Sequence, residues 1–192
     1  MDSLKFLLYT LARIGLLLAS LALALVFGKI FFPIIASLVP DSMNNLNNFF
    51  LSPVSGSVVA WLTMLVLLAV LFFDDGRRHA AYESWSSINV SIALILMFMV
   101  YFIPVIFRDS FSAEGKGRLF YEFYYFPCKW LNGLQGIDLT LSAALGIGLI
   151  LIACLLMYIL SYRLYVRKHP VILRRSESLQ TCLLYTSPSP RD

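Results

Sequence analysis

The sequence predicts an all-α fold, a polytopic membrane protein built as a bundle of four transmembrane helices. Hydrophobic residues make up 59% of the 192 residues and charged residues only 14%, whereas soluble domains have about 45–50% and about 25%. The mean hydropathy is +0.79. Four separate apolar segments are long enough to cross a bilayer, which takes about 20 residues. A soluble globular protein, a disordered chain and a nucleic-acid binder are therefore excluded.

The first span is expected over about residues 10–30. Arg13 and Lys29 bracket an uncharged stretch, Ile14–Gly28, which would form roughly 22 Å of helix. Long basic side chains can extend along a helix to the headgroups. We therefore expect Arg13 near one headgroup layer and Lys29 near the other, with Pro33 weakening the helix beyond Lys29.

The other three spans are expected at residues 53–73, 88–107 and 139–162. Ser52 is a good N-cap for the second span, and Pro53 suits its first helical position. Asp138 is the expected N-cap of the fourth span. The connections are then two outer loops, at residues 40–52 and 108–138, and one cytoplasmic loop, at residues 74–87.

The connection at residues 74–87 carries the densest charge cluster of the chain, and Gly76 is a typical helix stop. We interpret this segment as a solvated turn whose arginines set the topology. The alternative is a metal or phosphate–metal site, because carboxylates and imidazoles are metal ligands. The ligands of such a site would be Asp74, Asp75, His79 and Glu83.

The distribution of Lys and Arg predicts that both termini face the cytoplasm, since cytoplasmic loops carry an excess of these residues. In that orientation nine basic residues lie inside: Lys5, Arg13, Arg77, Arg78, Arg163, Arg167, Lys168, Arg174 and Arg175. Five lie outside: Lys29, Arg108, Lys116, Arg118 and Lys129. The predicted location is the plasma membrane.

The last eleven residues, Cys182–Asp192, resemble residue by residue a translated transposon-based sequencing adapter. We therefore expect a four-helix domain at residues 1–181 and a non-native tail read off the end of a genomic or metagenomic fragment. The natural chain beyond Thr181 is then unknown, and a bacterial origin is expected. With the tail set aside, Cys128 and Cys154 predict neither a disulfide framework nor a zinc site.

Arg13 and Asn89 are the candidate functional residues within the apolar segments. An ionisable residue at the centre of a membrane helix costs at least about 2.5 kcal/mol and is a functional candidate by default. Snorkelling of Arg13 to the headgroups is the preferred interpretation, and a buried guanidinium that binds a partner is the alternative. No intramembrane Asp or Glu is expected to pair with it, so Asn89, a backbone carbonyl or another subunit would have to do so.

Residues 120–130 of the third loop contain seven aromatic residues. Because Trp and Tyr concentrate at membrane interfaces, the segment is expected to lie at the outer headgroups. A surface that binds a ligand or a protein is the alternative. Cys128 is expected to be a buried or interfacial thiol and not a nucleophile, since no histidine lies near it in the sequence.

The fourth span contains two pairs of small residues spaced four apart, Ser142/Gly146 and Ala144/Gly148. Small residues let helices approach closely in lipid. We interpret them as the face on which this helix packs within the chain. Homo-oligomerisation or binding of a protein partner through the fourth helix is the alternative.

The sequence contains no GxSxG, HExxH or Walker A motif, and we expect no catalytic residue, no cofactor and no metal. It therefore predicts a non-catalytic accessory protein or subunit that acts through helix packing and loop contacts. The alternative is a small transporter or channel component, or the N-terminal part of a truncated permease. The lipid bilayer is the expected partner, with no nucleic acid.

Overall fold

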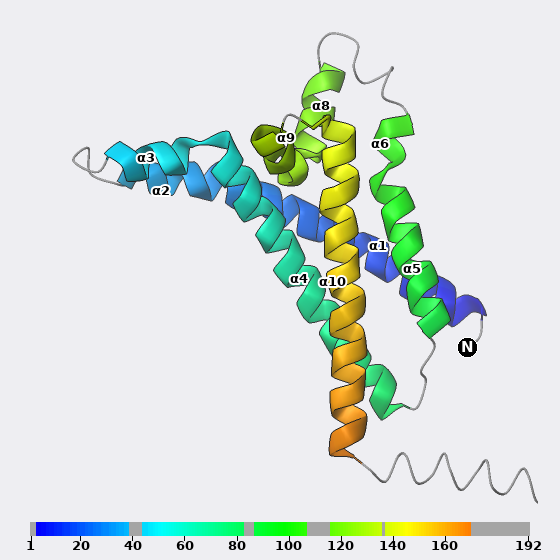
Figure 1. Cartoon of the computed structure of the whole chain (residues 1–192). Helices are drawn as coiled ribbons and strands as arrows, with labels where there is room; N and C mark the ends of the chain where they lie inside the picture. Colours follow the sequence, from blue (N-terminus) through cyan, green and yellow to red (C-terminus); the bar gives the residue numbers. More distant parts are fainter. Residues whose placement is uncertain (1–2, 39–43, 83–86, 107–115, 136, 170–192) are drawn as a thin grey trace, which may run out of the picture.

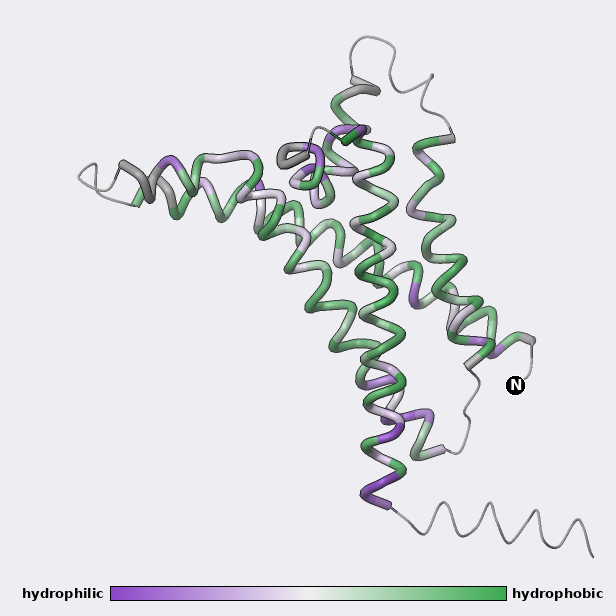
Figure 2. The backbone as a smooth tube through the Cα atoms, viewed as in Figure 1, coloured by the Kyte–Doolittle hydropathy of each residue, from purple (hydrophilic) through white to green (hydrophobic). Residues whose placement is uncertain are grey.

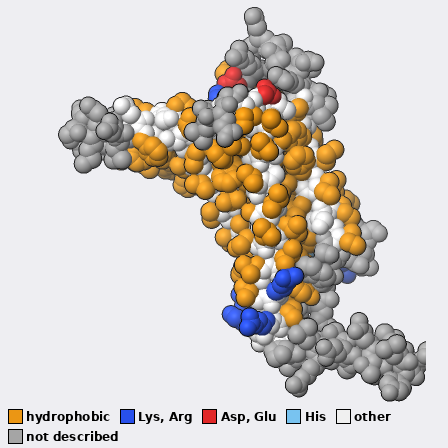
Figure 3. Space-filling view, in the orientation of Figure 1, with side chains coloured by type: hydrophobic (Ala, Val, Ile, Leu, Met, Phe, Trp, Pro, Cys, Tyr) orange, Lys and Arg blue, Asp and Glu red, His pale blue; other side chains and the backbone are white. Residues whose placement is uncertain are grey.

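The computed structural model describes residues 3–38, 44–82, 87–106, 116–135 and 137–169, which are helical apart from short turns (Figure 1). Four helices are long and apolar enough to cross a membrane: Leu4–Ile35, Pro53–Ala81, Ile88–Val105 and Leu139–Lys168. Only 28–39% of the residues in their most apolar stretches are buried. Much of their apolar surface therefore faces outward, as lipid contact requires (Figure 3). The predicted all-α class is confirmed, and the adapter-like tail lies outside the described residues.

The first span consists of three consecutive segments: α1 (Ser3–Val26), the π-helical turn η1 (Phe27–Phe31) and α2 (Phe32–Leu38). The N–H of Phe32 donates to the carbonyl of Phe27, five residues back. Pro33 follows directly and has no N–H to donate, and a π turn accommodates such a defect within a helix. The helix therefore continues past Pro33, and its backbone hydrogen bonds at this turn span five residues where an α-helix spans four.

The second span, α4 (Pro53–Ala81), runs about two turns beyond its predicted end. Ser52 precedes it in an extended conformation, and Pro53 occupies its first turn. Gly76 is not a helix stop, because it is buried within α4, where a Cβ atom would overlap the carbonyl oxygen of Tyr158. Glycine is needed there for close approach of the last helix. The first eight residues of the predicted cytoplasmic loop are thus helical.

The third span is formed by α5 (Ser87–Tyr101) and α6 (Ile103–Ile106), and the fourth by α10 (Leu139–Lys168). The break at Phe102 lies two residues before Pro104, which cannot donate a helical hydrogen bond. Asp138 caps α10 as predicted, because its carboxylate accepts the N–H of Thr140 at 3.2 Å.

In the assembled fold, α10 packs along α4 and α1 crosses α4 at a steep angle (Figure 1). The two predicted outer loops contain further helices. α3 (Asn44–Leu51) folds back on α2, where the rings of Phe32 and Phe50 lie 5.0 Å apart. The other loop forms an aromatic cap over the start of α10, made of α8 (Lys116–Tyr124), the 3-10 turn η3 (Phe126–Cys128) and α9 (Lys129–Gln135).

Candidate functional site

A cluster of polar side chains joins three of the long helices near the end of the bundle where α4 and α10 finish. Tyr9 and Arg13 come from α1, Asp75 and His79 from α4, and Tyr158 from α10. The four-residue spacing within α1 and within α4 places each pair on one helix face. We call these five residues the polar cluster.

The centre of the polar cluster is a buried ion pair. Nη2 of Arg13 donates to Oδ1 of Asp75, and the hydroxyl of Tyr9 donates to Oδ2 of the same carboxylate at 3.1 Å. The side chains of Arg13 and Asp75 are only 16% and 6% exposed. The Arg13 guanidinium carbon also lies 4.9 Å from the centre of the Tyr9 ring. Both carboxylate oxygens are thus engaged, and the charge of Arg13 is balanced inside the bundle.

His79 extends the polar cluster from α4 to α10. Its Nδ1 lies 2.8 Å from the hydroxyl of Tyr158, a residue that is fully buried. Its ring lies 5.6 Å from the Tyr9 ring and 5.6 Å from the Tyr158 ring, centre to centre. The cluster is therefore a continuous series of contacts that fixes α1, α4 and α10 relative to one another.

The structure corrects the prediction for Arg13. Its side chain does not extend outward as expected for snorkelling but turns into the bundle and pairs with Asp75, a carboxylate that was not expected there. This partner was missed because the second span was predicted to end at Phe73, which placed Asp75 in a loop. Asn89 lies half-buried in the first turns of α5.

The alternative of a metal site at the charge cluster finds no support in the described residues, which contain no group of three His, Cys, Asp or Glu that could hold a metal ion. Asp75 pairs with Arg13. Oδ2 of the neighbouring Asp74 instead lies 2.7 Å from Nε of Arg78, an exposed residue four positions further along α4. Glu83 lies outside the described residues. The carboxylates of α4 thus have two different roles, one buried between helices and one on the surface.

The aromatic segment that was predicted to lie at the headgroups forms the end of the bundle, and part of it is buried there. Tyr125 and Phe126 are buried and belong to the core. Ser57 of α4 anchors the segment: its hydroxyl donates to the carbonyl of Phe126 at 2.6 Å and accepts the backbone N–H of Trp130 at 2.8 Å. The aromatic cap therefore closes one end of the bundle as part of its core.

Lys29 and Cys128 are both held by aromatic side chains at this end. Nζ of Lys29 lies 3.8 Å from the centre of the Phe123 ring, within the range of a cation–π contact. Cys128 is buried, as predicted, and its Sγ lies 3.4 Å from the hydroxyl of Tyr101. Burial raises the pKa of the Cys128 thiol to about 11. The thiol therefore stays protonated near neutral pH, which makes it a poor nucleophile.

The small residues of α10 fall on two sides of the helix. Ser142 and Gly146 are buried, and a Cβ atom on Gly146 would lie 2.6 Å from Sγ of Cys128. The indole N–H of Trp61 donates to the Gly146 carbonyl at 2.9 Å. Gly146 therefore packs closely against Cys128 and Trp61 of the same chain. Ala144 and Gly148 are half-buried, and oligomerisation through them stays a prediction.

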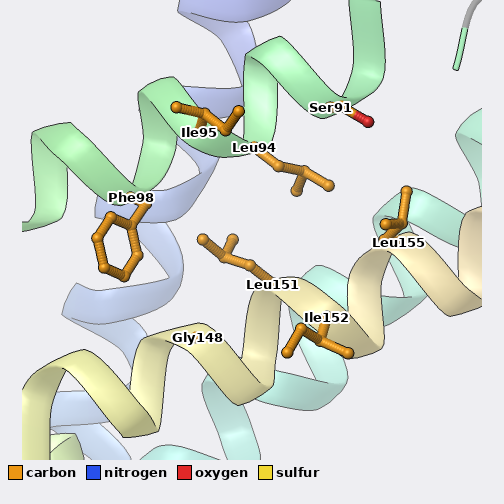
Figure 4. A pocket seen from close by; sticks show the side chains of 8 residues that line it. All are labelled: Ser91, Leu94, Ile95, Phe98, Gly148, Leu151, Ile152 and Leu155. Carbon is orange, nitrogen blue, oxygen red and sulfur yellow. The ribbon is translucent and has the colours of Figure 1, made fainter. Parts of the chain in front are cut away.

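Gly148 faces an apolar hollow of about 300 Å³ between α5 and α10. Figure 4 shows Leu94 of α5 and Leu151 of α10 pointing toward each other across this space. The hollow is lined by Ser91, Leu94, Ile95, Phe98, Gly148, Leu151, Ile152 and Leu155. A Cβ atom added at Gly148 would meet nothing within 4 Å, so this glycine leaves α5 and α10 loosely packed at this point.

Two glycines on α10 should respond oppositely to the same substitution. Gly146→Ala is expected to destabilise the fold by about 1–3 kcal/mol, because the new methyl group overlaps Cys128 in a packed region. Gly148→Ala should stabilise it by up to about 1 kcal/mol, because alanine favours the helix and the site is open. Equilibrium unfolding with SDS in mixed micelles, followed by circular dichroism, measures both. Equal effects of the two variants would contradict the packing described here.

The polar cluster combines a carboxylate, an imidazole, a guanidinium and two phenols, but its members are bonded to one another. Their arrangement fixes helices and balances charge. Comparison of the chain with models of protein families, with curated proteins and with solved structures found no match.

Proposed function

We propose that the protein is a non-catalytic integral membrane subunit or accessory protein that acts through helix packing and loop contacts. This proposal rests on the polar cluster, whose residues contact one another between the protein's own helices. Arg13 forms an ion pair with Asp75, and His79 forms a hydrogen bond with Tyr158. A transport path needs polar groups that line a water-filled cavity. Here the charge of Arg13 is instead balanced by a neighbouring helix.

The proposed location is the plasma membrane of a bacterium, with both termini in the cytoplasm. α1 begins at the end of the bundle where α4 and α10 finish, because Tyr9 contacts Asp75 and His79 contacts Tyr158. Lys and Arg side chains gather where α10 ends (Figure 3). The excess of basic residues on the cytoplasmic side of membrane proteins supports this orientation.

Photo-crosslinking in cells that express the protein from its own locus tests the proposed role. Photoreactive residues are placed one at a time on two outward faces, Leu62, Val66 and Val70 of α4 and Leu145, Leu149 and Leu156 of α10, all of which are exposed. A subunit is expected to cross-link to one defined polypeptide from one face, while the other face cross-links only to lipid. Cross-links to lipid alone from both faces would contradict the proposal.

Proteoliposomes test the transporter or channel alternative. Under the proposed function, fluxes of H⁺, Na⁺ and K⁺ into vesicles that contain the wild-type protein equal those into protein-free vesicles. A larger flux that disappears in the Asp75→Asn variant would favour transport, because this carboxylate lies at the centre of the polar cluster.

A further inference from the structure

A second hollow, of about 200 Å³, lies between the last turns of α4 and α10 and is separate from the polar cluster. Arg77 comes from α4, and Lys168 and His169 come from the end of α10. Ser161 and Tyr165 add two hydroxyl groups to its wall. The hollow therefore brings several hydrogen-bond donors, two of them cationic, to one place.

Among the described residues, no acidic side chain neutralises the two cations of this hollow. Arg77 and Lys168 form no ion pair within the part of the chain that the structure describes. The acidic side chains nearby on α4 are already engaged, Asp74 by Arg78 and Asp75 by Arg13. The hollow is thus a concave surface with positive charge available to an anion.

The position of the hollow limits what that anion can be. Its remaining walls are apolar: Phe73 is half-buried, and the side chain of Leu164 is 42% exposed on the outside of α10. Along α10 the apolar surface gives way to Lys and Arg at this level (Figures 2 and 3). Such a change along a membrane-spanning helix is typical of the depth at which the headgroups of a bilayer meet its acyl chains.

We propose that this hollow binds the phosphate group of an anionic phospholipid. Arg77 and Lys168 bind the phosphate, and the hydroxyl of Ser161 donates to its oxygens. The acyl chains extend from the hollow over Leu164 and lie along the apolar surface of the bundle. This site is independent of the proposed function and of the polar cluster.

Native mass spectrometry of the full chain in a mild detergent tests the site by counting bound lipids during titration with dioctanoyl phosphatidylglycerol. A basic residue in direct contact with the phosphate is expected to contribute about fivefold to the affinity, an effect of the size known for basic residues near an anionic membrane surface. The variant Arg77→Gln/Lys168→Gln is therefore expected to bind about 25-fold more weakly than the wild type. Both residues are exposed, so the variant should fold normally.

The matched control is Arg163→Gln/Arg167→Gln, which removes the same charge from exposed positions of α10 that do not line the hollow. This control is expected to bind the lipid almost as tightly as the wild type. Equal losses in the two double variants would overturn the proposal, because they would indicate attraction by net charge alone. An affinity for dioctanoyl phosphatidylcholine equal to that for phosphatidylglycerol would also overturn it.

Soluble anions separate a lipid site from a site for a free phosphate compound. Glycerol phosphate and inorganic phosphate offer the same anionic group without acyl chains. They are expected to displace the lipid only at much higher concentrations, because they lack the apolar contact with Leu164. Displacement at concentrations equal to that of the lipid would overturn the assignment to a phospholipid.

Discussion

Replacing Asp75 with alanine is expected to destabilise the bundle by about 3–5 kcal/mol, the usual cost of breaking a buried ion pair by removing one partner. Arg13 would keep its charge but lose its counter-ion, and its side chain is only 16% exposed. Tyr9 would lose the acceptor of its hydroxyl group. Unfolding with SDS in mixed micelles measures the loss of free energy.

The adjacent carboxylate provides the control. Asp74 pairs with Arg78 on the surface, where both side chains are about half exposed or more, and Asp74→Ala should change the stability by less than about 1 kcal/mol. The double variant Arg13→Met/Asp75→Leu should recover most of the loss, because it removes both charges. Equal effects of Asp74→Ala and Asp75→Ala would show that the ion pair does not hold the helices together.

Replacing Gly28 with leucine is expected to destabilise the fold by about 3 kcal/mol or more, since overpacking a tight contact costs about 1–3 kcal/mol even for small additions. A Cβ atom on Gly28 would lie 2.5 Å from the carbonyl oxygen of Gly56 and 2.8 Å from Cβ of Ala60. A Cβ atom on Gly56 would lie 2.7 Å from the carbonyl oxygen of Gly28. The first and second spans therefore meet backbone to backbone, and only their separation can make room for a side chain.

Gly15 is the matched control for this prediction, because it lies on α1 and a Cβ atom there would meet nothing within 4 Å. Gly15→Leu should leave the stability unchanged or raise it slightly through higher helix propensity. The same SDS titration compares the two variants. A Gly28→Leu protein as stable as the Gly15→Leu protein would rule out the close crossing of η1 and α4.

The four spans could be predicted because hydropathy depends on local sequence, and Asp138 could be assigned because a cap bonds to residues next to it. The end of α4, by contrast, could not be predicted. A loop is the usual place for two adjacent charges followed by a glycine, as in Asp74, Asp75 and Gly76. Their helical conformation depends on contacts with Arg13, 62 residues from Asp75, and with Tyr158.

The aromatic cap shows a similar limit. The aromatic composition of residues 120–130 suits both a membrane interface and a protein core, so composition alone could not separate the two. The decisive contact is made by the hydroxyl of Ser57, which lies 69 residues before Phe126. A serine in an apolar span is a weak signal for such a partner, because it can also bond to its own helix.

The ion pair between α1 and α4 also bears on how the chain enters the membrane. During synthesis Arg13 reaches the membrane first, and Asp75 follows 62 residues later. An unpaired arginine costs about 2.5–3.5 kcal/mol at the centre of a membrane helix and less toward its ends, where Arg13 lies. We therefore expect α1 to reach its final depth only once α4 has inserted, because the two spans are joined by charge at one end and by Gly28 and Gly56 at the other.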